Sequence, residues 1–162
     1  MNNSVVDAIE SGFSAKGLTT LRFNFRGVGG SAGEYDEGEG EVKDVMTAVA
    51  FLKRYIDGDA GMALAGYSFG AWMASRAAIR IQDVGALFLV AYPFAFYGAD
   101  ELKLFSKRIY LIGGEYDDIS PIDSLLKVYK ELPVPEKNLK IIPTDHFYGG
   151  KEGEITRRAP GA

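Results

Sequence analysis

The sequence predicts an α/β domain in three layers (α/β/α), with helices on both faces of a mostly parallel sheet of about five strands. Two observations carry this prediction. Segments rich in β-branched and aromatic residues alternate with amphipathic helical segments along the chain. Residues 84–91, VGALFLVA, form a nearly continuous apolar run, as in a strand buried on both faces. Because no internal repeat or linker interrupts the pattern, we expect residues 1–162 to form a single domain.

The first half of the chain predicts two helices and two strands. Apolar residues at helical spacing indicate a helix over residues 4–16. Residues 18–25, LTTLRFNF, are rich in β-formers and predict the first strand. Glycines and acids over 26–39 indicate a loop, and a helical apolar face follows over 40–57. The apolar residues of 62–66 then predict the second strand.

The second half predicts three further strands and two helices. Ser120 and Pro121 suit the start of a helix, with serine as N-cap and proline at the first helical position. In chain order we expect a helix over 69–81, strands over 84–91 and 108–112, a helix from residue 121, and a strand over 139–143. The connection 92–107 is irregular and aromatic, and a polar tail with at best a weak helix ends the chain.

Composition excludes several classes of function. A net charge of −4 and a pI near 5.1 argue against a surface for nucleic acid or anionic membranes. The absence of cysteine and the single histidine, His146, exclude thiolate and histidine-rich metal sites, and we expect no metal or organic cofactor. The first ten residues have no basic region, and no apolar run reaches the roughly 18 residues that span a bilayer. A cytoplasmic location is therefore expected.

The stretch Gly66-Tyr67-Ser68-Phe69-Gly70 has the pattern G-x-S-x-G between a predicted strand and a predicted helix. In that context the pattern indicates a nucleophile elbow. Serine at the tip of such a turn has a strained backbone, and side chains two residues to either side are expected to clash. The turn presents the hydroxyl of Ser68 at a helix N-terminus, where developing negative charge is stabilised.

Two further groups of polar residues follow strands of the predicted sheet. An acidic cluster, residues 115–118, follows the strand over 108–112, and His146 follows the last strand. Carboxyl ends of parallel strands meet at one edge of the sheet, so a serine, an acid and the only histidine are expected together. The chain order is nucleophile, acid, base. Glu115 or Asp118 could reach the same place as Asp117, whereas Asp145 is expected to form a turn.

Four stretches resemble the α/β-hydrolases, in particular the small hydrolases without a cap domain that are related to dienelactone hydrolase. They are LRFNFRGVGGSAGEYDEGEGE, LAGYSFGAWMA, GGEYDDISP and TDHFY. The resemblance implies a truncated α/β-hydrolase fold. By the roles in that family, it also implies Ser68 as nucleophile, His146 as general base, Asp117 as the residue that orients His146, and Phe69 as donor of one oxyanion-hole N–H.

Aromatic residues near the elbow are candidates for a substrate pocket. The group Tyr92, Phe94, Phe96 and Tyr97 could belong to the core or to a pocket wall, and we favour the wall. The pocket residues we predict are Tyr67, Tyr92 and Phe94. The connection 92–107 is too short for a helical lid domain, so we expect an open, shallow site. The acidic run over 34–41 is expected to be solvated, with a divalent cation site as the alternative.

The resemblance also implies parts that this sequence lacks. Members of the family carry strands and an oxyanion loop before the helix that begins here at about Ser4, and one of those strands lies between the strands predicted at 18–25 and 62–66. Three explanations would account for the resulting gap in the sheet. The chain could be a fragment, the 18–25 strand could pair directly with 62–66, or a second copy could cover the exposed edges in a homodimer.

These observations together predict a serine hydrolase that acts on a small-molecule carboxylic ester or thioester through an acyl-enzyme. The alternative is a non-catalytic or severely impaired protein of the same fold, without a complete oxyanion hole.

Overall fold

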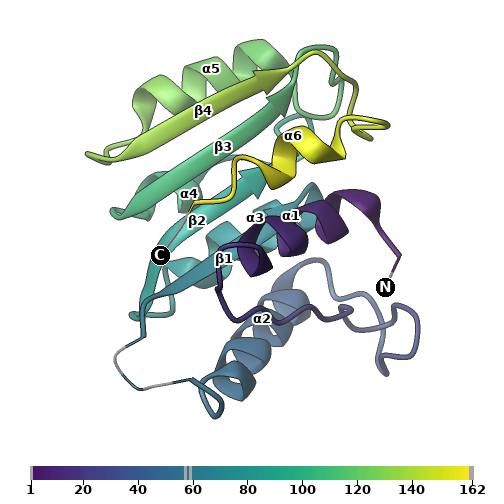
Figure 1. Ribbon diagram of the computed structural model, residues 1–162, viewed down its shortest axis with the longest axis vertical. Helices are drawn as coiled ribbons and strands as arrows, with labels where there is room; N and C mark the ends of the chain where they lie inside the picture. Colours follow the sequence, from purple (N-terminus) through teal and green to yellow (C-terminus); the bar gives the residue numbers. More distant parts are fainter. Residues whose placement is uncertain (1, 57, 59, 161–162) are drawn as a thin grey trace.

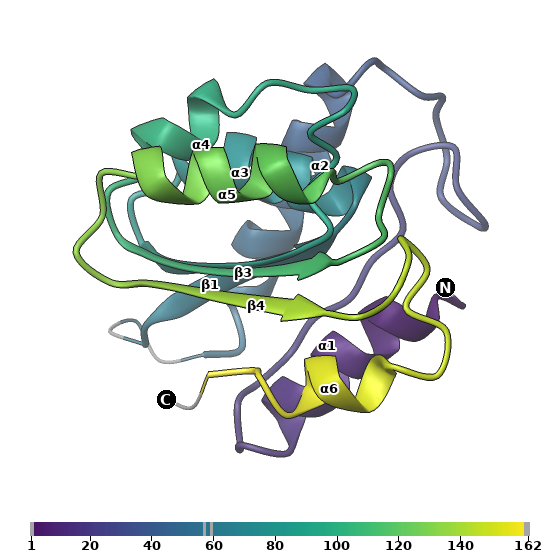
Figure 2. The same ribbon diagram turned by 90° about the horizontal axis from the view of Figure 1, so that it is seen from above.

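The computed structural model describes residues 2–56, 58 and 60–160. A parallel sheet in the order β1-β2-β3-β4 forms the middle layer (Figure 1). Its strands are β1 (Met62–Tyr67), β2 (Val84–Val90), β3 (Arg108–Gly114) and β4 (Lys137–Ile142). The helices are α1 (Ser4–Ser14), α2 (Glu39–Leu52), α3 (Phe69–Ala78), α4 (Asp100–Leu104), α5 (Ile122–Glu131) and α6 (Glu152–Thr156). Figure 2 shows α3, α4 and α5 on one face of the sheet and α1 and α6 on the other, which confirms the three layers.

The apolar run of β2 is divided between the two faces of the sheet. Leu87 and Leu89 belong to the core cluster under α3, α4 and α5, whereas Phe88 and Val90 belong to the cluster under α1 and α6. All four side chains are almost completely buried. This alternation explains why a strand with helices on both faces has no polar position, as the sequence predicted.

The two ends of the described chain pack together on one face of the sheet. Asn3 caps α1 by accepting hydrogen bonds from the N–H groups of Val5 and Val6, both at 3.1 Å. Gly12 lies against α6, where a Cβ atom would stand 2.6 Å from the carbonyl oxygen of Thr156. The close contact between α1 and α6 therefore depends on glycine at this position.

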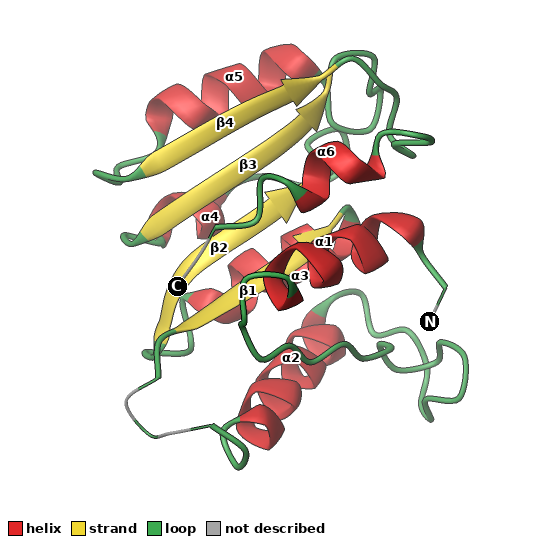
Figure 3. Ribbon diagram, viewed as in Figure 1, coloured by secondary structure: helices red, strands yellow, loops and turns green. Residues whose placement is uncertain are grey.

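The prediction of a strand over residues 18–25 is wrong, because this segment has no ladder partner and runs as a loop past α2 (Figure 3). Its aromatic side chains serve another purpose: Phe23 and Phe25 pack against the cluster that joins α2 to α3. Arg22 pairs with Asp7 of α1. The β-forming composition of the segment reflects apolar contacts with helices, and four strands are found instead of about five among the described residues.

One edge of the sheet is left open in the part of the chain that the structure describes. β1 is paired in parallel with β2 from Met62 to Tyr67, and no described segment forms a ladder on its other side. Ala63 and Ala65 on this strand are exposed. The proposed direct pairing of residues 18–25 with β1 is therefore wrong, while covering of the edge by a second copy stays a prediction.

Several element boundaries differ from the predictions. α2 ends at Leu52, and residue 57, the predicted end, lies outside the described residues. The connection 92–107 contains the short helix α4. Pro121, rather than the predicted Ser120, is the N-cap of α5, and no side-chain hydrogen bond caps this helix. None of the helices in the described ranges is long and apolar enough to cross a membrane.

Candidate active site

Ser68 stands in a tight turn between β1 and α3. Its backbone has φ +52° and ψ −119°, a region that residues other than glycine rarely occupy. Its N–H donates to the carbonyl of Val90 on β2 at 2.9 Å, which fixes the turn to the sheet. A Cβ atom on Gly66 would lie 2.2 Å from the carbonyl oxygen of Gly70, so the first glycine of the pattern is required by close approach. A Cβ on Gly70 would meet nothing within 4 Å, so the expected clash is wrong for the second glycine.

The hydroxyl of Ser68 and the carboxylate of Asp117 lie on opposite sides of the His146 ring. Nε2 of His146 is 2.8 Å from Oγ of Ser68, and Nδ1 is 2.8 Å from Oδ2 of Asp117. Asp117 and His146 are buried, with exposed fractions of 4% and 7%. Because the carboxylate accepts from Nδ1–H, Nε2 is left to accept the proton of the serine hydroxyl. The three residues that the sequence singled out thus form one hydrogen-bonded chain.

The turn after β3 selects Asp117 among the neighbouring acids. Its Oδ1 accepts the N–H groups of Ile119 and Ser120 at 2.9 and 2.8 Å, so the carboxylate is held by the backbone as well as by His146. Glu115 and Asp118 are exposed. The alternatives that the sequence left open at this point therefore lie outside the hydrogen-bonded chain.

The loop that carries His146 is fastened on two sides. Oδ1 of Asp145 accepts the N–H of Phe147 at 3.0 Å, so Asp145 forms a turn as predicted. The hydroxyl of Tyr67, the residue before Ser68, donates to the carbonyl oxygen of His146 at 2.9 Å. A tyrosine hydroxyl is protonated at neutral pH even at its ordinary pKa, and burial, with the nearby charges of Asp117 and Asp145, raises the pKa of Tyr67 further, to about 12. The tyrosine predicted as a pocket residue thus links the serine turn to the histidine loop.

Phe69 is the first residue of α3, directly after Ser68. The N–H groups of the first helical turn have no acceptor within the helix, and the helix dipole places positive charge there. The N–H of Phe69 is therefore free of the helix ladder and directly follows Ser68 in the chain.

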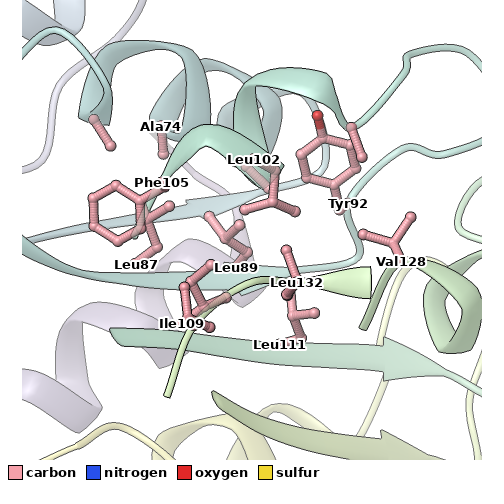
Figure 4. Close-up of a cluster of buried hydrophobic side chains, with 14 of the residues drawn as sticks. Ala74, Leu87, Leu89, Tyr92, Leu102, Phe105, Ile109, Leu111, Val128 and Leu132 are labelled. Atoms are coloured by element: carbon pink, nitrogen blue, oxygen red, sulfur yellow. The ribbon is translucent and has the colours of Figure 1, made fainter. Parts of the chain in front are cut away.

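Tyr92 belongs to the hydrophobic core and does not form the pocket wall that the sequence predicted. It is 1% exposed, lies among the apolar side chains of the cluster in Figure 4, and donates from its hydroxyl to the carbonyl of Gly98 at 2.8 Å. The ring of Phe94 is 4.5 Å from that of Tyr92 and packs against the same cluster. Packing against this cluster explains Tyr92 and Phe94, whereas Phe96 is exposed.

A recess that the sequence did not predict borders Phe69. We call it the Phe69 recess: it has a volume of about 280 Å³, Phe69 forms one wall, and residues 25–28, Tyr35 and Glu41 form the rest. In the sequence, only the glycine turn after Phe25 and the aromatic residues on both sides of that turn point to such a recess. Their contact with Phe69 could not be inferred, because residues 18–25 were expected in the sheet.

Comparisons with known proteins place these features in a family. The model of the Alpha/beta hydrolase family matches residues 6–153. The structure of an alpha-beta serine hydrolase homologue from Coxiella burnetii is similar with a TM-score of 0.86 and 32% identity, covering 98% of this chain and 76% of that chain. A protein of Xanthomonas campestris described as an a/b serine hydrolase without lid gives a TM-score of 0.84 at 30% identity, covering 96% and 70%. An uncharacterised protein of Rickettsia prowazekii is 29% identical over 97% of this chain and 69% of its own length.

Proposed function

The chain belongs to the alpha/beta hydrolase family, and we propose that it is a serine hydrolase that cleaves small carboxylic esters or thioesters through an acyl-enzyme on Ser68. The observation that carries the proposal is the pair of 2.8 Å hydrogen-bond distances on either side of His146, one to Ser68 and one to Asp117. A serine hydroxyl is a weak nucleophile at neutral pH and needs such a base within reach. The serine hydrolase relatives from Coxiella burnetii and Xanthomonas campestris support the same reaction class.

Each of the proposed residues has one task in the reaction. Oγ of Ser68 attacks the carbonyl carbon of the ester while Nε2 of His146 takes its proton, and Asp117 stabilises the resulting imidazolium. The carbonyl oxygen becomes an oxyanion that accepts the N–H of Phe69. As the tetrahedral intermediate collapses, His146 gives its proton to the leaving alcohol or thiol. Water, activated by His146, then attacks the acyl-serine, releases the carboxylic acid and returns the proton to Oγ.

The competing reading is a non-catalytic protein of the same fold. The elbow itself supplies one oxyanion donor, the N–H of Phe69, and loss of one donor of a complete hole costs about 10²- to 10³-fold in kcat. The two readings differ in whether Ser68 reacts at all.

A fluorophosphonate probe distinguishes the two readings, because it needs an activated serine but no substrate pocket. We expect one probe per folded chain at Ser68, no labelling of Ser68→Ala, and much slower labelling of His146→Ala. Ser106→Ala, which removes an exposed serine far from His146 in the sequence, is the matched control and is expected to label as the parent does. Absence of labelling in folded parent protein would refute the serine hydrolase and favour the non-catalytic reading.

A further inference from the structure

We propose that the Phe69 recess binds the acyl group of the ester and that it accepts uncharged aliphatic chains in preference to chains bearing a carboxylate or phosphate. This inference rests on the proposed function and names the substrate class of the same site. Its starting point is position: the ring that forms one wall belongs to the residue directly after Ser68, and adjacent Cα atoms are about 3.8 Å apart. Ser68 itself does not line the recess, and the proposal is that an acyl chain attached to Ser68 extends past Phe69 into it.

The apolar walls of the recess are held in place by aromatic contacts. The rings of Phe25 and Phe69 meet edge to face at 5.5 Å, and the ring of Tyr35 is 6.1 Å from that of Phe69. Trp72 contacts Phe69 from α3 at 5.7 Å. Such pairs stabilise one arrangement of the rings, so the recess is a formed surface before any ligand binds.

The charged residues at the recess already have partners. The guanidinium of Arg26 donates to Asp44 at 2.8 to 3.2 Å and lies 3.6 Å from Asp36. The buried carboxylate of Glu41 accepts the N–H groups of Asp36 and Gly38 at 2.9 and 2.8 Å. Arg26 thus has two carboxylates beside it, and a third carboxylate on a substrate would meet net negative charge.

The size of the recess limits the chain it can take. About 280 Å³ lies just below the 300 to 1,000 Å³ that drug-sized ligands occupy. Since the recess offers apolar walls and no unpaired charge, its ligand is a short neutral aliphatic chain rather than a lipid-length or charged acyl group.

Binding is tested with Ser68→Ala protein, which cannot turn substrate over. Trp72 is the only tryptophan in the sequence and touches Phe69, so its fluorescence reports on the recess. We expect a saturable change with methyl hexanoate, and at least about tenfold weaker binding of monomethyl adipate, which has the same chain length with a terminal carboxylate. Equal binding of the two esters would overturn the proposed preference.

A filling variant tests the location of the site. Val28 is 52% exposed on the rim, so Val28→Phe can extend into the recess, and we expect at least about tenfold weaker binding of methyl hexanoate. Leu104→Phe, at an exposed position of α4, is the matched control and should bind as the parent does. If Val28→Phe binds unchanged, or if no ester gives a saturable signal, the recess does not bind the acyl group.

The fluorophosphonate result separates this inference from the proposed function. Labelled Ser68 without a saturable fluorescence change overturns the recess and leaves the hydrolase standing. Saturable, Val28-dependent binding without labelling retains the recess as a ligand site and refutes the hydrolase.

Discussion

At the scale of single residues, the site depends on backbone groups as much as on side chains. Asp117 is fixed by two N–H groups of its own turn, and His146 by the hydroxyl of Tyr67 on its carbonyl oxygen. Ser68 is fixed by the N–H bond to Val90. General acid–base chemistry needs distances near 3 Å, so these secondary contacts determine how well the proposed triad can work.

Tyr67→Phe tests the link between the serine turn and the histidine loop. The ring stays, but the partly buried carbonyl of His146 loses its donor, and we expect a loss of about 1–2 kcal/mol in the free energy of unfolding. The rate of fluorophosphonate labelling should fall as well, because the position of the imidazole is less fixed. Urea unfolding and labelling kinetics measure the two effects.

The control for this prediction is Tyr110→Phe. Tyr110 is a half-buried strand tyrosine whose hydroxyl makes no hydrogen bond among the described residues, so stability and labelling should both stay near the parent values. A loss in Tyr110→Phe as large as that in Tyr67→Phe would assign the effect to packing and contradict the prediction.

The two glycines of the elbow allow a second test at this scale. Gly66→Ala places a Cβ atom against the Gly70 carbonyl, and we expect a destabilisation of about 1–3 kcal/mol or more. Gly70→Ala meets open space inside a helix and should be neutral or stabilising by up to about 1 kcal/mol. Thermal unfolding of the pair decides, and equal losses in both variants would show that the steric explanation is incomplete.

At the scale of elements, the ion pair between Arg26 and Asp44 holds the loop after Phe25 to α2. Asp44 accepts the side chain of Arg26 and also its backbone N–H at 2.9 Å. These hydrogen bonds hold the pKa of Asp44 below its usual value. The wall of the Phe69 recess formed by residues 25–28 is thereby attached to a helix rather than to the sheet.

Asp44→Asn is expected to lower the free energy of unfolding by roughly 1–3 kcal/mol at neutral pH, because Arg26 loses a charged acceptor. The pKa of Asp44 is lowered on folding, so its stabilisation is present above the ordinary pKa of 3.8 and disappears as the pH falls through the folded value. The difference between parent and variant should therefore shrink in acid. Urea unfolding from pH 7 down to the acid limit measures it.

An exposed pair provides the comparison for Asp44. Asp83 pairs with Lys53 at the surface, and Asp83→Asn should cost less than about 1 kcal/mol at any pH. A loss for Asp44→Asn that does not change with pH would contradict the linkage argument.

At the scale of the whole molecule, segments from opposite ends of the chain close one face of the sheet. α1 and α6 cover Phe88, Val90 and Ile112, and Gly12 allows the two helices to touch. Lys16 donates to the carbonyl of Ala159 in the same contact. The layer opposite α3, α4 and α5 is thus made by the joining of residues far apart in sequence (Figure 2).

Gly12→Ala is expected to separate α1 from α6 and to lower stability by about 1–3 kcal/mol, since the added Cβ would stand 2.6 Å from the Thr156 carbonyl and 2.8 Å from Ala159. Gly153→Ala on α6, where the nearest atom is 3.5 Å away, is the control and should be tolerated. Calorimetric melting of both variants checks this, and an unchanged melting temperature for Gly12→Ala would contradict it.

The sequence by itself determined the alternation of helices and strands, the serine turn, and the order of Ser68, Asp117 and His146 along the strand ends. These follow from local rules: periodicity, glycine chemistry and the geometry of parallel strands. The choice of Asp117 among the acids of 115–118 was left to the structure, where its carboxylate meets His146. Only the tertiary structure decided which segments pack against each other. Residues 18–25 pack on helices instead of entering the sheet, Tyr92 is core, and the Phe69 recess forms between segments far apart in the chain. An apolar pattern predicts that a side chain is buried, but it does not predict which element the side chain contacts. Burial is non-directional, and any apolar partner satisfies it.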